Sequence, residues 1–215
     1  MVEDKNTISG LPTVRRLPMY LHILKELNAQ GREFVSSTLI GKKLELDSVQ
    51  VRKDLASTGI IGKPKIGFNI PALIDAIENY LGWDNNKDAF LVGVGSLGSA
   101  LLGYPGFEKR GLNIVAAFDV SPDKIGKSIR GVEVHSLDML PELAERMNIH
   151  LGIITVPAEC AQSIADAMAL AGIRGIWNFT QTYLQVPKSV FVQNEDLSAG
   201  LAVLSVKLAR TLKTK

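Results

Sequence analysis

Three glycines and one aspartate have the types and spacing of a dinucleotide site. Gly93, Gly95 and Gly98 follow an apolar run and precede a short helix-forming run. The first glycine permits a tight turn, the second lets the backbone approach a pyrophosphate, and the third lets the helix lie close to its strand. Asp119 lies 21 residues after Gly98, where a carboxylate can accept both ribose hydroxyls and repel a 2′-phosphate. The pattern therefore predicts NAD(H) binding in preference to NADP(H).

Two later strand ends extend this predicted site. Ligands of parallel sheets bind beyond the carboxyl ends of the strands, and 155–157 and 178–180 are strand ends of that kind. The start of the helix also offers N–H groups and a positive dipole end to the phosphates. The predicted cofactor residues are Gly93, Gly95, Ser96, Leu97, Gly98, Asp119, Thr155, Val156, Pro157, Asn178, Phe179 and Thr180.

Two plainer interpretations of the glycine-rich stretch compete with this one. A tight turn in an α/β sheet would use the same glycines without binding a ligand. The stretch 89–107 also carries no charge, and a membrane span needs about 20 apolar residues. Its five glycines and Pro105 argue against a span.

Basic residues cluster in the first third of the chain. Short helices expected over 38–43 and 49–57 predict a helix-turn-helix, whose second helix enters a major groove. The segment 60–68 alternates apolar and basic residues and predicts a β-hairpin wing with lysines for phosphates. In this region Asp54 alone opposes the basic cluster; the competing interpretation is a small solvated bundle. The predicted DNA-contacting residues are Ser48, Gln50, Arg52, Lys53, Lys63 and Lys65.

The remaining elements complete an α/β chain. Strands alternate with helices after a polar linker at 82–87, which predicts a doubly wound, mainly parallel sheet. The last helix, from Asp196, carries an apolar face that packs on its own domain or on a partner subunit. We expect a winged-helix DNA-binding domain over 1–82, a Rossmann NAD(H)-binding domain over 83–195 and a dimerisation helix over 196–215. The other expected elements are helices at 13–29, 71–82, 137–147 and 158–171 and strands at 132–135, 149–155, 175–179 and 190–192.

The composition excludes several classes of protein. Net charge is +2 and Cys160 is the single cysteine, so an intrachain disulfide is impossible and a reducing cytoplasm is favoured. We expect no secretory signal and no cluster with metal-ligand spacing. His22, His135 and His150 form no recognisable acid–base set. We therefore expect no catalytic residues, no metal, no membrane and no small-molecule substrate: the cofactor is sensed rather than turned over.

Eight segments of the chain match the pattern of a known family: Arg16-Leu17-Pro18-Met19-Tyr20, Gln50-Val51-Arg52-Lys53-Asp54-Leu55, 92–101, Tyr104-Pro105-Gly106-Phe107, Phe118-Asp119-Val120, Thr155-Val156-Pro157, Trp177-Asn178-Phe179 and Asn194-Glu195-Asp196-Leu197. With these segments, a winged helix-turn-helix, an NAD-type Rossmann domain and a final exposed helix, in that order, resemble the Rex family of redox-sensing transcriptional repressors. The resemblance covers nearly the whole chain. It implies a homodimer that exchanges its final helices, binds operator DNA when the NADH/NAD⁺ ratio is low and releases it when NADH binds.

The resemblance also implies a switch. Tyr104 matches a tyrosine that responds to NADH, and Asp196 matches an aspartate that pairs across the dimer with that tyrosine and with an arginine of the first helix. The chain has His22 at this arginine position, and a histidine replaces the pairing only when it is protonated. It also departs from the family pattern in the wing, which ends Lys65-Ile66-Gly67-Phe68, and at Gln181, where a proline is commoner.

Two other functions stay open from the residues alone. One is a small NAD-dependent oxidoreductase with an N-terminal helical dimerisation domain, and the other is a CoA- or nucleotide-binding module without a DNA role. The basic residues of the first third discriminate against both. The missing acid–base set argues against an oxidoreductase, and Asp119 argues for a ribose diol.

Overall fold

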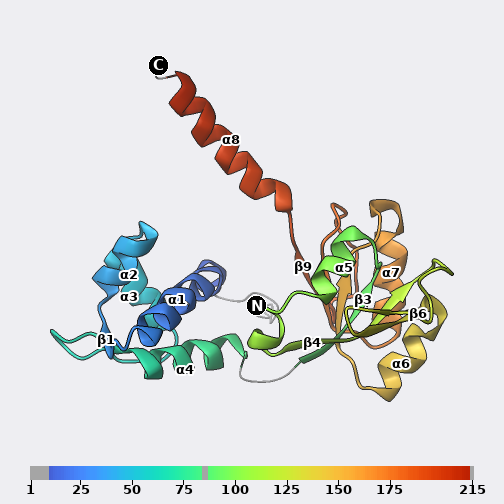
Figure 1. Cartoon of the computed structure of the whole chain (residues 1–215), viewed down its shortest axis with the longest axis horizontal. Coiled ribbons are helices and arrows are strands. Elements are labelled where there is room, and N and C mark those ends of the chain that lie inside the picture. The colour runs from blue at the N-terminus through green and yellow to red at the C-terminus, as the bar shows by residue number, and fades with distance from the viewer. Residues whose placement is uncertain (1–9, 84–86, 214–215) are drawn as a thin grey trace, which may run out of the picture. The chain divides into compact units, whose positions relative to one another are not determined.

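The computed structural model describes residues 10–83 and 87–213 and divides into two compact units, residues 1–85 and 86–215 (Figure 1). The division falls inside the stretch 82–87 expected to be a linker. Each unit has a hydrophobic core of its own.

The first unit packs helices around one apolar core. Polar side chains cap three of its helices by accepting backbone N–H groups: Ser36 caps α2, Asp47 caps α3 and Asn69 caps α4. Tyr20, Leu24 and Ile77 are among the fully buried members of this core. Its elements are α1 (Leu11–Ala29), β1 (Phe34–Val35), α2 (Ser37–Leu44), α3 (Ser48–Ala56), β2 (Phe68–Asn69) and α4 (Ile70–Leu81).

The wing is shorter than the predicted hairpin. Lys63 and Gly67 form an isolated antiparallel bridge around a tight turn, and Phe68 pairs with Val35 of β1 instead of the preceding arm. Pro64 has no N–H for a ladder, and Lys65 adopts a left-handed backbone with φ 63°. These two residues close the turn early, and the pairing of Phe68 with β1 limits the hairpin to the single Lys63–Gly67 bridge.

The second unit is a doubly wound sheet, as expected. Its strand order is β5-β6-β4-β3-β7-β8-β9, and every pairing is parallel except β5 with β6. The elements are β3 (Lys87–Val92), α5 (Ser96–Leu102), η1 (Glu108–Arg110), β4 (Leu112–Asp119), β5 (Ser128–Ile129), β6 (Val132–Ser136), η2 (Leu137–Met139), α6 (Leu140–Arg146), β7 (Leu151–Ile154), α7 (Ala158–Leu170), β8 (Gly175–Asn178) and β9 (Phe191–Asn194).

The central strand shows why the sheet is buried on both faces. Phe90 and Val92 of β3 belong to a core built with α6 and α7, whereas Ala89 and Leu91 belong to a second core that α5 helps to cover. Successive side chains of a strand point to opposite faces, so the continuous apolar run at 89–92 fills both cores. The hairpin strand β5 was not expected from the sequence, and the predicted helix over 137–147 begins as the 3-10 turn η2.

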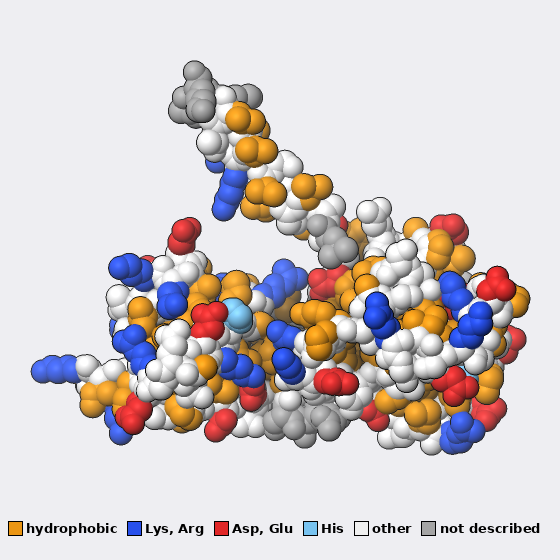
Figure 2. All heavy atoms as spheres, in the orientation of Figure 1, with side chains coloured by type: hydrophobic (Ala, Val, Ile, Leu, Met, Phe, Trp, Pro, Cys, Tyr) orange, Lys and Arg blue, Asp and Glu red, His pale blue; other side chains and the backbone are white. Residues whose placement is uncertain are grey.

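The final helix, α8 (Leu197–Lys213), presents a row of apolar side chains to solvent (Figure 2). Within the described part of the chain, no helix combines the length and apolarity needed to cross a membrane. The exposed apolar residues of α8 are Leu201, Val203, Leu204, Val206, Leu208 and Leu212.

Candidate functional site

The glycine turn is packed on one side and open on the other. Gly93 has φ 98°, a left-handed conformation that favours glycine. A Cβ at Gly98 would collide with the carbonyl oxygen of Gly93, whereas a Cβ at Gly95 would meet nothing within 4 Å. The protein itself therefore requires Gly93 and Gly98. Gly95 leaves bare backbone facing open space, which suits a ligand that must approach it closely.

The strand end at Thr155 supports this turn from the neighbouring strand. β3 and β7 pair in parallel, with Val92 opposite Ile154, so the turn and the strand end meet at one edge of the sheet. Thr155 Oγ1 lies 2.6 Å from the Gly93 carbonyl oxygen and 3.1 Å from that of Val92. The structure thus brings Thr155 and Gly93 together, with the threonine positioning the turn.

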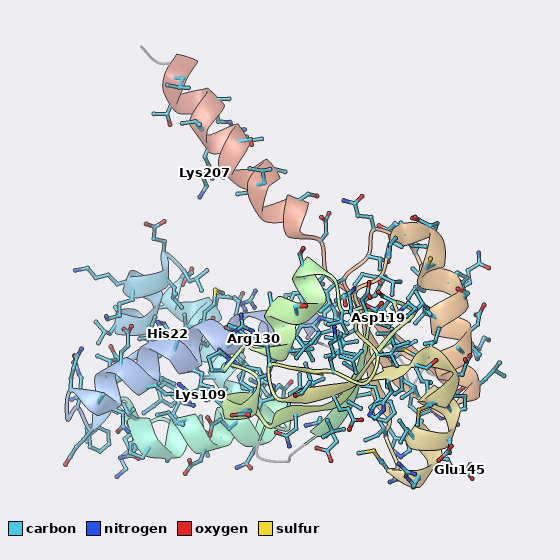
Figure 3. The ribbon with its side chains drawn as sticks, turned by 45° about the vertical axis from the view of Figure 1, so that its right-hand side comes forward. His22, Lys109, Asp119, Arg130, Glu145 and Lys207 are labelled. Carbon is cyan, nitrogen blue, oxygen red and sulfur yellow. The ribbon has the colours of Figure 1, made fainter. Side chains whose placement is uncertain are left out.

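Asp119 ends β4 beside the same turn, with 9 % of the residue exposed (Figure 3). Its Oδ2 accepts the Val94 N–H at 2.8 Å and the Lys124 ammonium at 3.0 Å, and its Oδ1 accepts the Ser121 N–H at 2.9 Å. Burial acts to raise the pKa of Asp119, but these hydrogen bonds outweigh it and lower the pKa below its ordinary value. The group at the predicted ribose position is therefore a carboxylate.

Sequence reasoning missed Lys124, although it lies five residues after Asp119. The turn that begins at Ser121 folds back, with the Lys124 N–H donating to the Ser121 carbonyl oxygen at 3.0 Å. That fold returns the lysine to the aspartate. The Ser121-Pro122-Asp123 turn was the available signal.

The side chain of Asn178 is committed to the protein. It is fully buried, and its Nδ2 donates to the Thr182 carbonyl oxygen and to Asn194 Oδ1 at 2.9 and 2.8 Å. Its Oδ1 accepts both the N–H and the hydroxyl of Thr180. In this conformation Asn178 therefore shapes the loop after β8, and its predicted contact with a cofactor stays a prediction.

An aromatic hollow of about 280 Å³ lies in the second unit. Tyr104 packs against Phe107 with ring centroids 4.9 Å apart, and Phe107 packs against Trp177 at 5.4 Å. Half of Tyr104 is exposed. Phe107, Trp177 and Glu195 were absent from the predicted site, since aromatic side chains carry no spacing signal of their own. The lining residues are Leu101, Tyr104, Phe107, Trp177, Phe179 and Glu195.

Five of the six predicted DNA-contacting residues are exposed on the first unit. Arg52 and Lys53 project from α3, and Lys63 and Lys65 lie on the shortened wing. Ser48, the first residue of α3, is half-buried. The arrangement offers cations to phosphates from a helix and from a turn of the same unit.

Asp54 is the buried centre of a hydrogen-bond cluster between α1 and α3, which we call the Asp54 cluster. Arg16 donates through Nε at 2.6 Å and Nη2 at 2.8 Å, and the Tyr20 hydroxyl donates at 2.6 Å. Thr13 and Gln50 each donate at 2.9 Å. Only 1 % of the Asp54 side chain is exposed.

The negative charge of Asp54 is therefore buried and paired inside the first unit. Burial acts to raise its pKa, but the hydrogen bonds led by Arg16 and Tyr20 outweigh it and hold the pKa well below its usual range. Burial, with Asp54, raises the pKa of Tyr20. Because Arg16 already pairs with it, Asp54 does not oppose the basic surface as its place in the sequence suggested.

The predicted switch residues lie in different units. His22 Nε2 of α1 is 3.1 Å from Glu26 Oε1, and both side chains are exposed (Figure 3). Asp196 accepts the N–H and hydroxyl of Ser198 at the start of α8, and these hydrogen bonds lower its pKa. Tyr104 lies in the aromatic hollow. Their predicted coupling stays a prediction.

No group of three or more histidine, cysteine, aspartate or glutamate side chains could hold a metal ion within 10–83 and 87–213. Cys160 is exposed and unpaired with another cysteine.

Family models match both units. Residues 7–56 match the N-terminus of putative DNA-binding proteins, and residues 84–182 match a CoA binding domain. The curated redox-sensing transcriptional repressor Rex of Treponema denticola is 48% identical over 95% of this chain and 97% of its own length. The Rex of Bacteroides fragilis is 44% identical over 92% of this chain and 90% of its own.

Solved structures agree with the sequence comparison. RSP, a Rex-family repressor, superposes with a TM-score of 0.87 at 34% identity and covers 95% of this chain and 96% of its own. The same repressor in complex with β-NAD⁺ and operator DNA gives a TM-score of 0.87 over 97% of this chain and 99% of its own. Since these relatives are regulators that match from end to end, the chain belongs to the Rex family of redox-sensing transcriptional repressors.

Proposed function

We propose that this chain represses transcription by binding operator DNA through its first unit, and that NADH binding to its second unit releases the DNA. One observation carries the proposal: the Asp119 carboxylate is held beside an open glycine turn at the carboxyl edge of a parallel sheet, the geometry that selects a ribose diol next to a pyrophosphate. RSP has been solved in complex with β-NADH and in complex with β-NAD⁺ and operator DNA. The ligands of that relative support NAD(H) and double-stranded DNA as the ligands here.

The proposal includes a homodimer. Exposed apolar residues such as Leu204 and Leu208 run along α8, and a dimer would bury them. A dimer also suits a palindromic operator, with half-sites about one helical turn or more apart. We retain the division into a DNA-binding domain over 1–82, an NAD(H) domain over 83–195 and a dimerisation helix over 196–215, in the cytoplasm where the chromosome lies.

The CoA module remains the second candidate, because a CoA binding domain model matches 84–182. The Asp119 carboxylate argues against it, since the adenosine of CoA carries a ribose phosphate that this group would repel. The oxidoreductase alternative is disfavoured because the full-length relatives are repressors.

One titration tests the proposal against both alternatives. Labelled DNA with A/T-rich palindromes is bound to the protein, and fluorescence polarisation follows release by NADH, NAD⁺, NADPH or CoA. We expect release by NADH at concentrations at which NAD⁺ and CoA leave the complex intact. Failure to bind any duplex, or release by CoA alone, would contradict the proposal.

We further propose that His22, Tyr104 and Asp196 form the switch, with NADH displacing Tyr104 and one state pairing Asp196 with His22 of the other subunit. A histidine carries charge mainly below about pH 6.5, whereas arginine is charged throughout. His22→Arg should therefore remove most of the difference in the NADH concentration that releases DNA at pH 6 and at pH 8. Glu26 lies one helical turn after His22 on α1 and is its ion-pair partner, so Glu26→Gln is the control. It should not change the NADH concentration that releases DNA from the His22→Arg variant. Identical pH profiles of native protein and arginine variant would exclude His22 from the switch.

A further inference from the structure

We propose that Lys124 is a specificity-determining residue of the cofactor site, which acts through Asp119 to set how strongly 2′-phosphorylated dinucleotides are excluded. The inference rests on the proposed NAD(H) site and deepens it. Its starting point is the ion pair between Lys124 Nζ and Asp119 Oδ2 at 3.0 Å.

Counting hydrogen-bond sites on the carboxylate shows why the lysine matters. An ionised carboxylate offers about four acceptor positions. The Val94 N–H and Lys124 occupy Oδ2, and the Ser121 N–H occupies one position of Oδ1. One position is left, although a ribose diol needs two.

Of the three hydrogen-bond donors to Asp119, Lys124 is the one that can move away. Val94 and Ser121 donate from backbone that the turns hold in place, whereas the lysine side chain is 35% exposed and flexible. When a diol binds with both hydroxyls, Lys124 leaves Oδ2 and stays within reach of the ribose. The lysine is then a second group of the ribose site, and the 2′ position of the ligand meets both.

The positive charge of Lys124 determines whether the lysine strengthens or weakens NADPH binding. A lone carboxylate repels a 2′-phosphate, but a carboxylate paired with an ammonium is close to neutral as a pair. Lys124 therefore softens the exclusion of NADPH that Asp119 provides. Without the aspartate, the same ammonium becomes a cation available to the phosphate.

Two variants should consequently move the cofactor preference in opposite directions. Lys124→Met removes the positive charge and should weaken NADPH binding about tenfold, the scale expected for one nearby charge in a partly exposed site, with NADH affinity changed less than about threefold. Asp119→Asn should strengthen NADPH binding and collapse the preference. In the double variant the gain from Asp119→Asn should be lost, because no cation remains for the phosphate.

The experiment titrates NADH and NADPH into the full-length unmodified protein and each variant, following nucleotide fluorescence. Lys127→Met is the matched control. Lys127 is an exposed lysine three positions after Lys124, so the variant removes the same charge nearby and should leave the preference for NADH over NADPH unchanged. Lys124→Arg keeps the charge and should keep the preference within about threefold, so the charge can be tested even where Lys124→Met does not fold.

The outcomes separate this inference from the proposed function. A preference that is unchanged by Lys124→Met, or changed equally by Lys127→Met, overturns the role of Lys124 while NADH binding by the native protein leaves the proposed function standing. A native protein that binds neither nucleotide overturns the proposed function and this inference with it. Opposite shifts of the preference in the two single variants support it.

Discussion

The two units each bury an aspartate beside a cation, and the difference between them separates a structural carboxylate from one that we propose binds a ligand. Asp54 accepts five hydrogen bonds from Thr13, Arg16, Tyr20 and Gln50. Asp119 accepts three, two of them from backbone. Both have a lowered pKa, so ionisation alone does not distinguish them.

The two carboxylates differ in how many of their acceptor positions are occupied and in what surrounds them. Asp54 has no acceptor position left and is enclosed by side chains that join α1 to α3. Asp119 retains a position and accepts the N–H of Val94, the residue before Gly95, where an added Cβ would meet open space. A buried carboxylate with spare acceptor capacity beside open space is the better indication of a ligand site.

The largest expected effect is on folding of the first unit. Asp54→Asn removes the charge that faces Arg16 inside a buried cluster, and breaking such a pair costs about 3–5 kcal/mol. Asp119→Asn should cost less, about 1–3 kcal/mol, because fewer hydrogen bonds depend on it. Urea denaturation compares the two variants, with the exposed Asp75→Asn as control. Equal losses for Asp54→Asn and Asp75→Asn would contradict a structural Asp54 cluster.

Acid should reveal the same cluster. Because the folded pKa of Asp54 lies well below its ordinary value, the stability it supplies is complete above the unfolded value of about 4 and is lost as pH falls below that value. The free energy of unfolding of the native first unit should therefore fall between about pH 4 and pH 2 more steeply than in Asp54→Asn. Parallel curves for the two proteins over this range would exclude Asp54 as the source of the acid sensitivity.

Several features of the cofactor site and the fold could be predicted from the sequence alone. Gly93, Gly95, Gly98 and Asp119 were predicted from spacing, because backbone geometry demands those types in that order. The fold class and family were confirmed by comparison with relatives that match along the whole chain.

Long-range partners escaped prediction. Asp54 looked like an opposing surface charge, yet Arg16 reaches it from 38 positions away. Trp177 of β8 donates a hydrogen bond of 3.0 Å to Glu195, which directly follows β9. The wing is short in part because Phe68 pairs with Val35 of β1, more than 30 residues earlier. Such contacts depend on tertiary packing, which local pattern does not encode.

A smaller effect is expected from one bond of the Asp54 cluster. Tyr20→Phe keeps the buried ring but removes the hydroxyl that donates to Asp54 at 2.6 Å, and a hydrogen bond to a charged group contributes about 1.5–3 kcal/mol. The loss should be smaller than that of Asp54→Asn and should vanish in the Asp54→Asn background. A double-mutant cycle in urea measures this coupling; strict additivity would mean that the hydroxyl does not act through the carboxylate.

The smallest effect on stability is expected at Gln50, where the Asp54 cluster meets the predicted DNA surface. Its Nε2 donates to Asp54 Oδ1 at 2.9 Å, and because an ionised Asp54 only accepts, the amide must turn its NH₂ group inward and its carbonyl oxygen away. Gln50→Ala should cost about 0.5–1.5 kcal/mol of stability. We expect it to weaken operator binding without changing the salt dependence, since a neutral amide releases no counterion.

Arg52→Ala supplies the contrast on the same helix. An exposed arginine that contacts a phosphate releases about one counterion on binding, so its loss should flatten the slope of log K against log salt by about one. Lys127→Ala, in the other unit, should leave the slope unchanged. If Gln50→Ala flattens the slope as much as Arg52→Ala does, then Gln50 acts by holding α3 and its cations in place through Asp54, and it does not itself contact a base. If only Arg52→Ala changes the salt slope, the Asp54 cluster orients the Gln50 amide, which then contacts a base edge. The buried Asp54 in that case influences DNA binding through the Gln50 side chain alone.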